Sequence, residues 1–226
     1  MAQKQNGFTL IEIAIVLVII GLLLGGVLKG QELIQSARVR NLISQQDGIK
    51  AAYFGFLDRF RAVPGDYNQA STNIAGAVGN GNNNGRIEPN GTGGSTIDEH
   101  IAVWEHLSKA GFINGSYTYA ATPETTTSAA TNPYARYLRL VYDTDYGSGT
   151  PATRHNLKTG NQVPSDILAE IDRKIDDGNP VLGTFQFSIY NGGGGNGSAP
   201  DPAKCYAGTA WNAATVEPNC GGASLF

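Results

Sequence analysis

The 226-residue chain has few of the residues that carry most enzyme chemistry, with two cysteines, three histidines and one methionine. It contains no H-E-x-x-H zinc motif, no phosphate-binding P-loop and no G-x-S-x-G nucleophile elbow. His100 and His106 are six residues apart and do not share a helix face, so we expect them to contact solvent or helix caps. His155 stands alone. We therefore expect a protein that is not an enzyme.

An excess of positive charge is also missing. The formal net charge is −3 and the isoelectric point is about 5.6, which argues against a basic surface for nucleic acid. The length is enough for a membrane helix and one globular domain. We therefore expect no nucleic-acid partner.

Charge is almost absent from residues 8–28, where Glu12 is the single charged residue before Lys29. An apolar run of this length can span a bilayer as a helix of about 20 residues. A signal peptide would have a shorter apolar core and an A-x-A cleavage site. A carboxylate in a bilayer costs about 2.5–3.5 kcal/mol, so Glu12 indicates a function beyond anchoring.

The orientation of this segment is ambiguous from charge and cysteines alone. More basic residues follow the run than precede it, which places the C-terminal side in the cytoplasm. Cys205 and Cys220 lie late in the chain among turn residues, which is typical of a disulfide in an oxidising compartment. The two signals disagree.

The stretch GFTLIE, residues 7–12, resembles the processing site of type IV pilins and their relatives. The resemblance implies that a prepilin peptidase cuts after Gly7 on the cytoplasmic face and then methylates Phe8. Glu12 matches the acidic fifth residue of the mature family members. The resemblance covers about the first thirty residues, and it implies a head outside the cytoplasm.

The position of Glu12 near the expected cleavage site has a physical explanation. Cleavage would leave a free α-amine on Phe8, and Glu12 lies one helical turn away on the same face. In a low-dielectric place an unpaired amine and an unpaired carboxylate are both costly, and pairing offsets much of that cost. The pair can form within one subunit or between neighbours. We hypothesise that Glu12 registers subunits during assembly.

The helix is predicted to continue past the membrane, since residues 31–61 contain no proline and keep helical spacing of apolar residues. Val63-Pro64-Gly65-Asp66 ends it. We expect a leader at 1–7, a transmembrane and filament-core helix at 8–28, its continuation packing on the head at 29–62, and a head at 63–226. The fold class is α+β, with the long helix packed on a small antiparallel sheet, as in pilins. The resemblance also implies that Cys205 and Cys220 close a C-terminal loop.

The apolar run departs from the family in one respect, because the proline common near Lys29 is missing. Four glycines take its place: Gly21, Gly25, Gly26 and Gly30. They weaken a helix by roughly 1 kcal/mol each, which favours local unwinding. They also suit close packing of helices through small residues. Both interpretations stay open.

Within the head, three strands and two helices are predicted. The strands are Tyr117–Ala121, Tyr137–Tyr142 and Thr184–Tyr190. One helix opens at a Thr96-x-x-Glu99 capping box and stops at Gly111, and the other covers Ser165–Asp177. The run at 192–197 fits G-x-G-x-x-G, but no helix follows, so we expect a flexible surface loop.

A calcium loop is suggested by the spacing of Asn80, Asn82 and Asn84 before Gly85. All three side chains are neutral, and Gly91 stands where a glutamate would close the site. A plain Asn/Gly turn is favoured, with calcium as the alternative. We expect no other cofactor.

Together these features predict the precursor of a minor subunit of a type IV pilus-like filament. Its partners would be the prepilin peptidase, other pilin subunits, the assembly platform and the bacterial inner membrane. It would cross that membrane once and then enter a filament. A pseudopilin of a type II secretion system is the first alternative. A membrane-anchored binding protein that never polymerises is the second.

Overall fold

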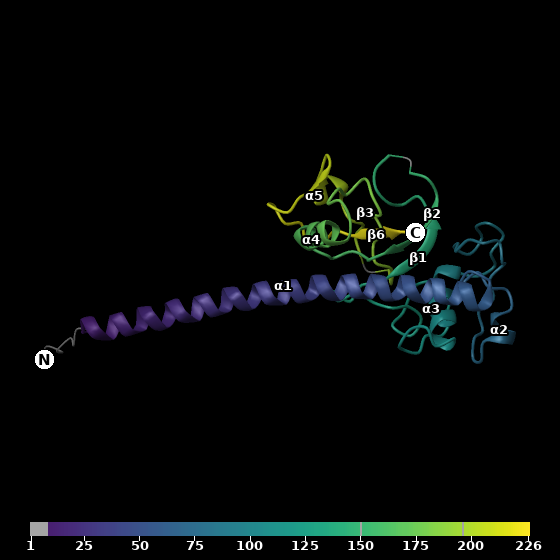
Figure 1. The fold of residues 1–226 in the computed structure, drawn as a ribbon, viewed down its shortest axis with the longest axis horizontal. Coiled ribbons are helices and arrows are strands. Elements are labelled where there is room, and N and C mark those ends of the chain that lie inside the picture. Colours follow the sequence, from purple (N-terminus) through teal and green to yellow (C-terminus); the bar gives the residue numbers. More distant parts are fainter. Residues whose placement is uncertain (1–8, 150, 196) are drawn as a thin grey trace, which may run out of the picture. The chain divides into compact units, whose positions relative to one another are not determined.

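The computed structural model describes residues 9–149, 151–195 and 197–226. The chain divides into two compact units, which meet between Arg38 and Val39. One helix, α1 (Leu10–Phe60), contributes to both units (Figure 1). The predicted long N-terminal helix is confirmed.

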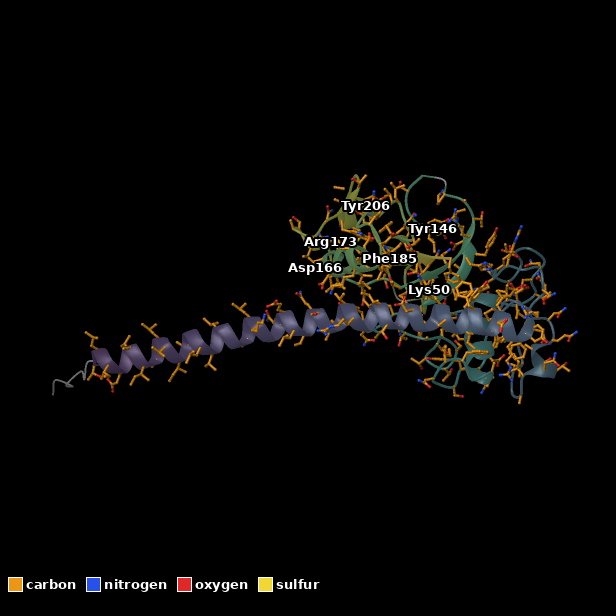
Figure 2. The ribbon with its side chains drawn as sticks, in the orientation of Figure 1. Lys50, Tyr146, Asp166, Arg173, Phe185 and Tyr206 are labelled. Carbon is orange, nitrogen blue, oxygen red and sulfur yellow. A yellow bond between two sulfur atoms is a disulfide. The ribbon has the colours of Figure 1, made fainter. Side chains whose placement is uncertain are left out.

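In the first unit, the described part is Thr9 and α1 up to Arg38, and none of these residues is buried. Its large apolar side chains between Leu10 and Leu28 are 46% to 89% exposed. Figure 2 shows side chains projecting both above and below this part of the ribbon. By length and composition, α1 is the one helix in the described chain that could cross a membrane. The described part of the first unit, residues 9–38, therefore has no core of its own.

The second unit contains a four-stranded antiparallel sheet in the order β1-β2-β6-β3. Its strands are β1 (Arg139–Asp143), β2 (Arg154–Lys158), β6 (Gly222–Leu225) and β3 (Phe185–Phe187). A small hairpin joins β4 (Tyr206–Ala207) and β5 (Ala210–Trp211). The remaining helices are α2 (Ala70–Asn73), α3 (Glu99–Lys109), α4 (Ser165–Ile175) and α5 (Pro202–Cys205). The predicted α+β class is confirmed.

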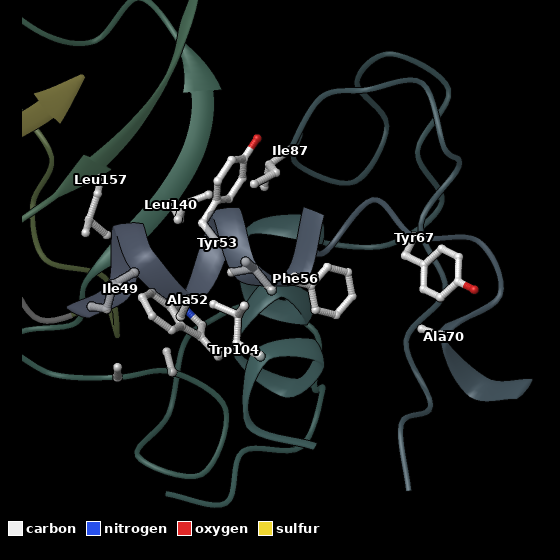
Figure 3. Packing of buried hydrophobic residues seen from close by; sticks show 14 of the residues in the cluster. Ile49, Ala52, Tyr53, Phe56, Tyr67, Ala70, Ile87, Trp104, Leu140 and Leu157 are labelled. Carbon is white, nitrogen blue, oxygen red and sulfur yellow. The ribbon is translucent and has the colours of Figure 1, made fainter. Parts of the chain in front are cut away.

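The main core of this unit forms where the second half of α1 meets the sheet and α3. Phe56 of α1 is fully buried, and Ile49 and Tyr53 pack into the same cluster (Figure 3). Leu157 of β2 and Trp104 of α3 also belong to this cluster. Burying a side chain such as Phe56 contributes about 1.5–3 kcal/mol. This packing explains why apolar residues keep helical spacing well beyond the membrane-length run.

A second core lies around α4. Leu42 of α1 packs there with Leu168 of α4, Phe185 of β3 and Trp211 of β5. Phe185 lies in the interior of this unit, and Tyr206 marks the hairpin beside it (Figure 2). The C-terminal segment therefore shares a core with α1 and the sheet.

The strand predictions were partly right. β1 and β3 lie at the predicted places, although β3 ends at Phe187. The predicted strand Tyr117–Ala121 was wrong, because Tyr119 N–H donates to the Glu105 carboxylate (3.0 Å) and no strand pairs with this segment. β2 and β6 were not predicted.

The interpretation of the histidines was wrong. His100 and His106 are 3% and 0% exposed, because α3 is enclosed by the loops around it. His106 Nδ1 accepts from Gly65 N–H (2.8 Å), and its Nε2 lies 2.8 Å from the Gly79 carbonyl oxygen. Burial lowers the pKa of His106. This histidine holds two loops against the helix.

The glycine-rich run was expected to be a flexible surface loop, but Gly192 and Gly193 are buried. Gly194 N–H donates to the buried Glu124 (3.4 Å to Oε2), and Gly192 carbonyl accepts from Tyr137 N–H (3.0 Å). Gly193 has φ +64°, and a Cβ there would lie 2.7 Å from the Glu124 carboxyl carbon. The turn therefore needs glycine for packing as well as for backbone conformation.

Candidate functional site

The N-terminal segment carries the residues with the strongest predicted roles. Gly7 and Phe8 lie outside the described residues, and Thr9 directly precedes α1. Glu12 Oε2 accepts two hydrogen bonds from Thr9, one from its N–H and one from its Oγ1, both at 2.7 Å. Glu12 N–H donates back to Thr9 Oγ1 (3.3 Å). This reciprocal pattern is a capping box.

The sequence signal for this box, Thr9-x-x-Glu12, was present but overlooked. The box satisfies backbone donors at the start of α1 that would otherwise have no partner. It also places a carboxylate at the positive end of the helix dipole, which is favourable. Glu12 therefore has a local structural role as well as the predicted role in assembly, which stays a prediction.

Around Glu12 the helix surface is apolar and uncovered. A Cβ added at Gly21, Gly25, Gly26 or Gly30 would meet nothing within 4 Å. These glycines are not required by packing inside the described chain. An uncovered apolar helix of this length needs lipid or other helices around it.

A disulfide joins Cys205 and Cys220, which are both fully buried. Their sequence separation is 15, and closure of such a loop contributes on the order of 3 kcal/mol. Hydrogen bonds fix the loop to α4. Ser165 Oγ donates to the Asn212 carbonyl (2.6 Å), and Trp211 Nε1–H donates to Asp172 Oδ2 (2.7 Å). The C-terminal loop is thus held by α4 as well as by the disulfide.

Three aspartates gather at the end of α4, with carboxylate oxygens of Asp172, Asp176 and Asp177 within 4.8 Å of one another. Each binds backbone N–H groups nearby, from Gly178 to Asp172 (3.0 Å), from Phe185 to Asp176 (2.8 Å) and from Asn179 to Asp177 (2.8 Å). Burial raises the pKa of Asp172. The three aspartates therefore stabilise the turn that follows α4 by accepting hydrogen bonds from its backbone.

The three asparagines of the suggested calcium loop do not converge through their oxygens. Asn80 pairs with Ser71, accepting from its N–H (2.9 Å) and donating to its Oγ (2.8 Å). Asn82 and Asn84 come together, and each donates from Nδ2 to the Gly93 carbonyl (3.1 Å). Calcium prefers oxygen ligands. Calcium binding stays a prediction, and the observed contacts are those of a turn.

Buried carboxylates organise this turn, and sequence reasoning missed that role. Asp66 accepts from Gly85 N–H (2.7 Å) and Asn84 N–H (3.1 Å). Glu99 accepts from Asn82 N–H (3.1 Å) and Glu88 N–H (3.0 Å). Burial raises the pKa of Glu99 to about 7. The signal that could have found them is the acid next to a glycine- and asparagine-rich loop, whose backbone N–H groups need acceptors.

The layout defined here is a long apolar N-terminal helix followed by a small antiparallel sheet, which is the α+β arrangement of pilins. A family model, the prokaryotic N-terminal methylation motif, matches residues 2–28. This motif is the signature of type IV pilin and pseudopilin precursors. No curated protein and no solved structure matches the chain.

The motif has general consequences for this chain. It implies processing by a prepilin peptidase and assembly with pilin machinery. It also points to a structural subunit rather than an enzyme. Together with the apolar helix, it is consistent with anchoring in a membrane.

Proposed function

We propose that this protein is the precursor of a structural, minor subunit of a type IV pilus-like filament. It is cut after Gly7, methylated at Phe8 and assembled through the first half of α1. One observation carries the proposal: the methylation motif, residues 2–28, overlaps the start of α1, where the large apolar side chains between Leu10 and Leu28 are uncovered within the described chain. Lipid first and neighbouring subunits later would supply that cover.

The head supports an extracytoplasmic location. The Cys205–Cys220 disulfide is typical of an oxidising compartment. The head has an extensive core, and its long loops are fixed by buried side chains such as His106 and Glu99. It is therefore suited to a filament surface, where a folded domain stays exposed.

Intact-mass spectrometry tests the proposal. Sheared surface filaments and washed membranes from one culture are compared in the same run. We expect a chain that starts at a methylated Phe8 in the filaments. A chain that still carries Met1–Gly7 in a strain with active peptidase would contradict both the cleavage site and the assembly role.

A pseudopilin of a type II secretion system is the second candidate, because the methylation motif is shared by pilin and pseudopilin precursors. The same experiment separates the two. A mature chain found only in the membrane fraction, combined with loss of protein secretion in a deletion strain, would favour the pseudopilin. The mature chain in sheared filaments would favour the pilus subunit.

A further inference from the structure

Lys158 of β2 is an almost completely buried lysine in the second unit. Its residue is 2% exposed, and its Nζ lies 2.5 Å from Oδ2 of Asp143, which is on β1. The two strands are paired neighbours in the sheet (Figure 1). Asp145 contributes a second carboxylate, whose Oδ2 lies 3.8 Å from the same Nζ. None of these three residues has a role in the proposed processing and assembly.

We propose that Lys158 and Asp143 condense into an amide that joins β1 and β2 covalently, with Asp145 transferring the protons. The new bond forms between Nζ and Cγ of Asp143, and the bond between Cγ and Oδ2 breaks. The ammonium group gives up two protons, and Oδ2 takes both and leaves as water. No oxidant, reductant or other reactant is needed. The inference concerns the head alone and holds for a pilus subunit and for a pseudopilin.

The environment of Lys158 favours the neutral amine, which is the form that can attack a carbon atom. Burial lowers the pKa of Lys158 despite the opposing charge of Asp143. Ala223 of β6 lies opposite Lys158 in the sheet register. Ala223 belongs to a small buried apolar cluster with Tyr146 and Leu225. Because opposite residues share one face of a sheet, the lysine stem has apolar neighbours.

The two oxygens of the Asp143 carboxylate have different partners, as the reaction requires. Oδ1 accepts from Asn156 Nδ2–H (2.9 Å) and from Asp145 N–H (3.1 Å). Two such donors stabilise the negative charge that develops on a carbonyl oxygen during attack. Oδ2 is the oxygen in contact with the lysine, so it is the one placed to take up protons and leave.

Proximity supplies what the same two groups lack when they are separate in water. An amine and a carboxylate that are held in contact can react as if each were present at a very high concentration. The pairing of β1 with β2 provides that contact before any reaction. The side chain of Asp145 is 59% exposed, so its carboxylate can move between Nζ and solvent and can carry protons from Nζ to Oδ2.

Mass spectrometry of the full-length protein, purified from membranes or filaments, tests the proposal. We expect an intact mass that is lower by one water than the sequence predicts, after the leader, the methyl group and the disulfide are taken into account. Trypsin should not cut after the modified Lys158. The peptides 140–154 and 155–173 should therefore appear as one branched species. Separate peptides with a cut after Lys158 would show an ion pair only and would overturn the proposal.

Two variants assign the roles of the residues. Lys158→Arg is the matched control, since a guanidinium keeps the positive charge but is not deprotonated in proteins, and it should lose no water. Asp145→Asn keeps the backbone N–H that donates to Asp143 but removes the proton acceptor. Its linkage should form about a hundredfold more slowly, so freshly made protein should be largely unlinked.

The Cys205–Cys220 disulfide, mapped in the same digest, shows whether each variant has folded. Loss of one water from Lys158→Arg would place the reaction at other residues and overturn the proposal. Complete linkage in freshly made Asp145→Asn would overturn the role assigned to Asp145.

Discussion

Residues 9–38 and residues 39–226 differ in what surrounds their side chains. In the first region no residue is buried, and glycine positions have open space around them. In the second region large side chains such as Trp104 and Phe56 are fully buried, and even charged groups such as Glu99 are enclosed. The sequence of the first region is therefore constrained by what lies outside the chain, whereas that of the second is constrained by its own core. A substitution should reveal which of the two constraints acts at its position.

The largest expected effect is on assembly, from Glu12→Val in the first region. The change removes the carboxylate but keeps an apolar helix, so the peptidase should still cut after Gly7. Filaments should be lost, because no charge remains to pair with the amine of a neighbour. Electron microscopy measures the filaments, and intact-mass spectrometry measures cleavage after Gly7. The unfolding midpoint of the head should not change. Normal filaments from Glu12→Val would contradict the role of Glu12 in assembly.

In the second region, Phe56→Ala should destabilise the head by about 3–5 kcal/mol, because it leaves a cavity in the main core. Urea unfolding measures the loss. Phe54→Ala is the matched control, since both residues lie on α1 and helix propensity cancels. Phe54 is 52% exposed and contacts the rings of Tyr53 and Phe226, so its loss should be about 1 kcal/mol.

Equal losses in the two phenylalanine variants would mean that the core does not centre on Phe56. Cleavage after Gly7 gives an independent readout of the first region. It should be unchanged in both variants, since neither residue lies near the processing site. A cleavage defect in Phe56→Ala would mean that the core of the head affects processing of the N-terminal segment, so the two regions would not be independent.

One motif occurs in both regions and shows why sequence reasoning succeeded unevenly. Thr96-x-x-Glu99 was predicted as a capping box, yet α3 begins at Glu99 with Asp98 at its N-cap. The Glu99 carboxylate binds Asn82 and Glu88 N–H groups instead, because α3 is enclosed and buried donors must be satisfied. Thr9-x-x-Glu12 forms the box, because nothing else in the described chain competes for its carboxylate.

The same reasoning explains the strands. α1 and α4 have continuous helical spacing, and their existence could be predicted. β2 reads RHNLK and β6 reads GASL, without a clear alternation of apolar residues. Their pairing is decided by distant partners, since Leu157 lies opposite Leu140 on one side and Ser224 on the other. Such contacts are not visible in a local pattern.

A smaller effect is expected from pH, through Glu99. Burial raises its pKa from 4.5 to about 7, so the folded head holds a proton that the unfolded chain releases. Stability should therefore fall as pH rises from 4.5 to about 7. Glu99→Gln removes this contribution, so its unfolding free energy should decline less than that of the wild type over this range.

The comparison isolates Glu99 because other titrating groups are common to both proteins. His100, whose pKa is lowered to about 4 by burial, has the opposite effect on the slope and cancels in the difference. Urea unfolding at several pH values between 4.5 and 7.5 gives the two slopes. Glu170→Gln on the half-exposed face of α4 is the control. Parallel curves for Glu99→Gln and the wild type would contradict the raised pKa.

The smallest effect on the chain itself is expected at Gly25. A Cβ there would meet nothing within 4 Å, and alanine is the better helix former by roughly 1 kcal/mol. Gly25→Ala should therefore leave the folding and the unfolding midpoint of the head unchanged. Any defect in filaments must then come from a process that involves other subunits or local unwinding.

Alanine and leucine at this position separate the two explanations of the glycine cluster. If the cluster serves to unwind the helix in a filament, Gly25→Ala should already reduce assembly, because it strengthens the helix. If the cluster serves close helix packing, alanine should be tolerated and Gly25→Leu should abolish assembly. Filament yield from the two variants, with cleavage as the control, decides between them. Normal assembly of Gly25→Leu would mean that position 25 faces lipid or solvent both before and after assembly. Contacts with neighbouring subunits would then have to be made by another face of α1.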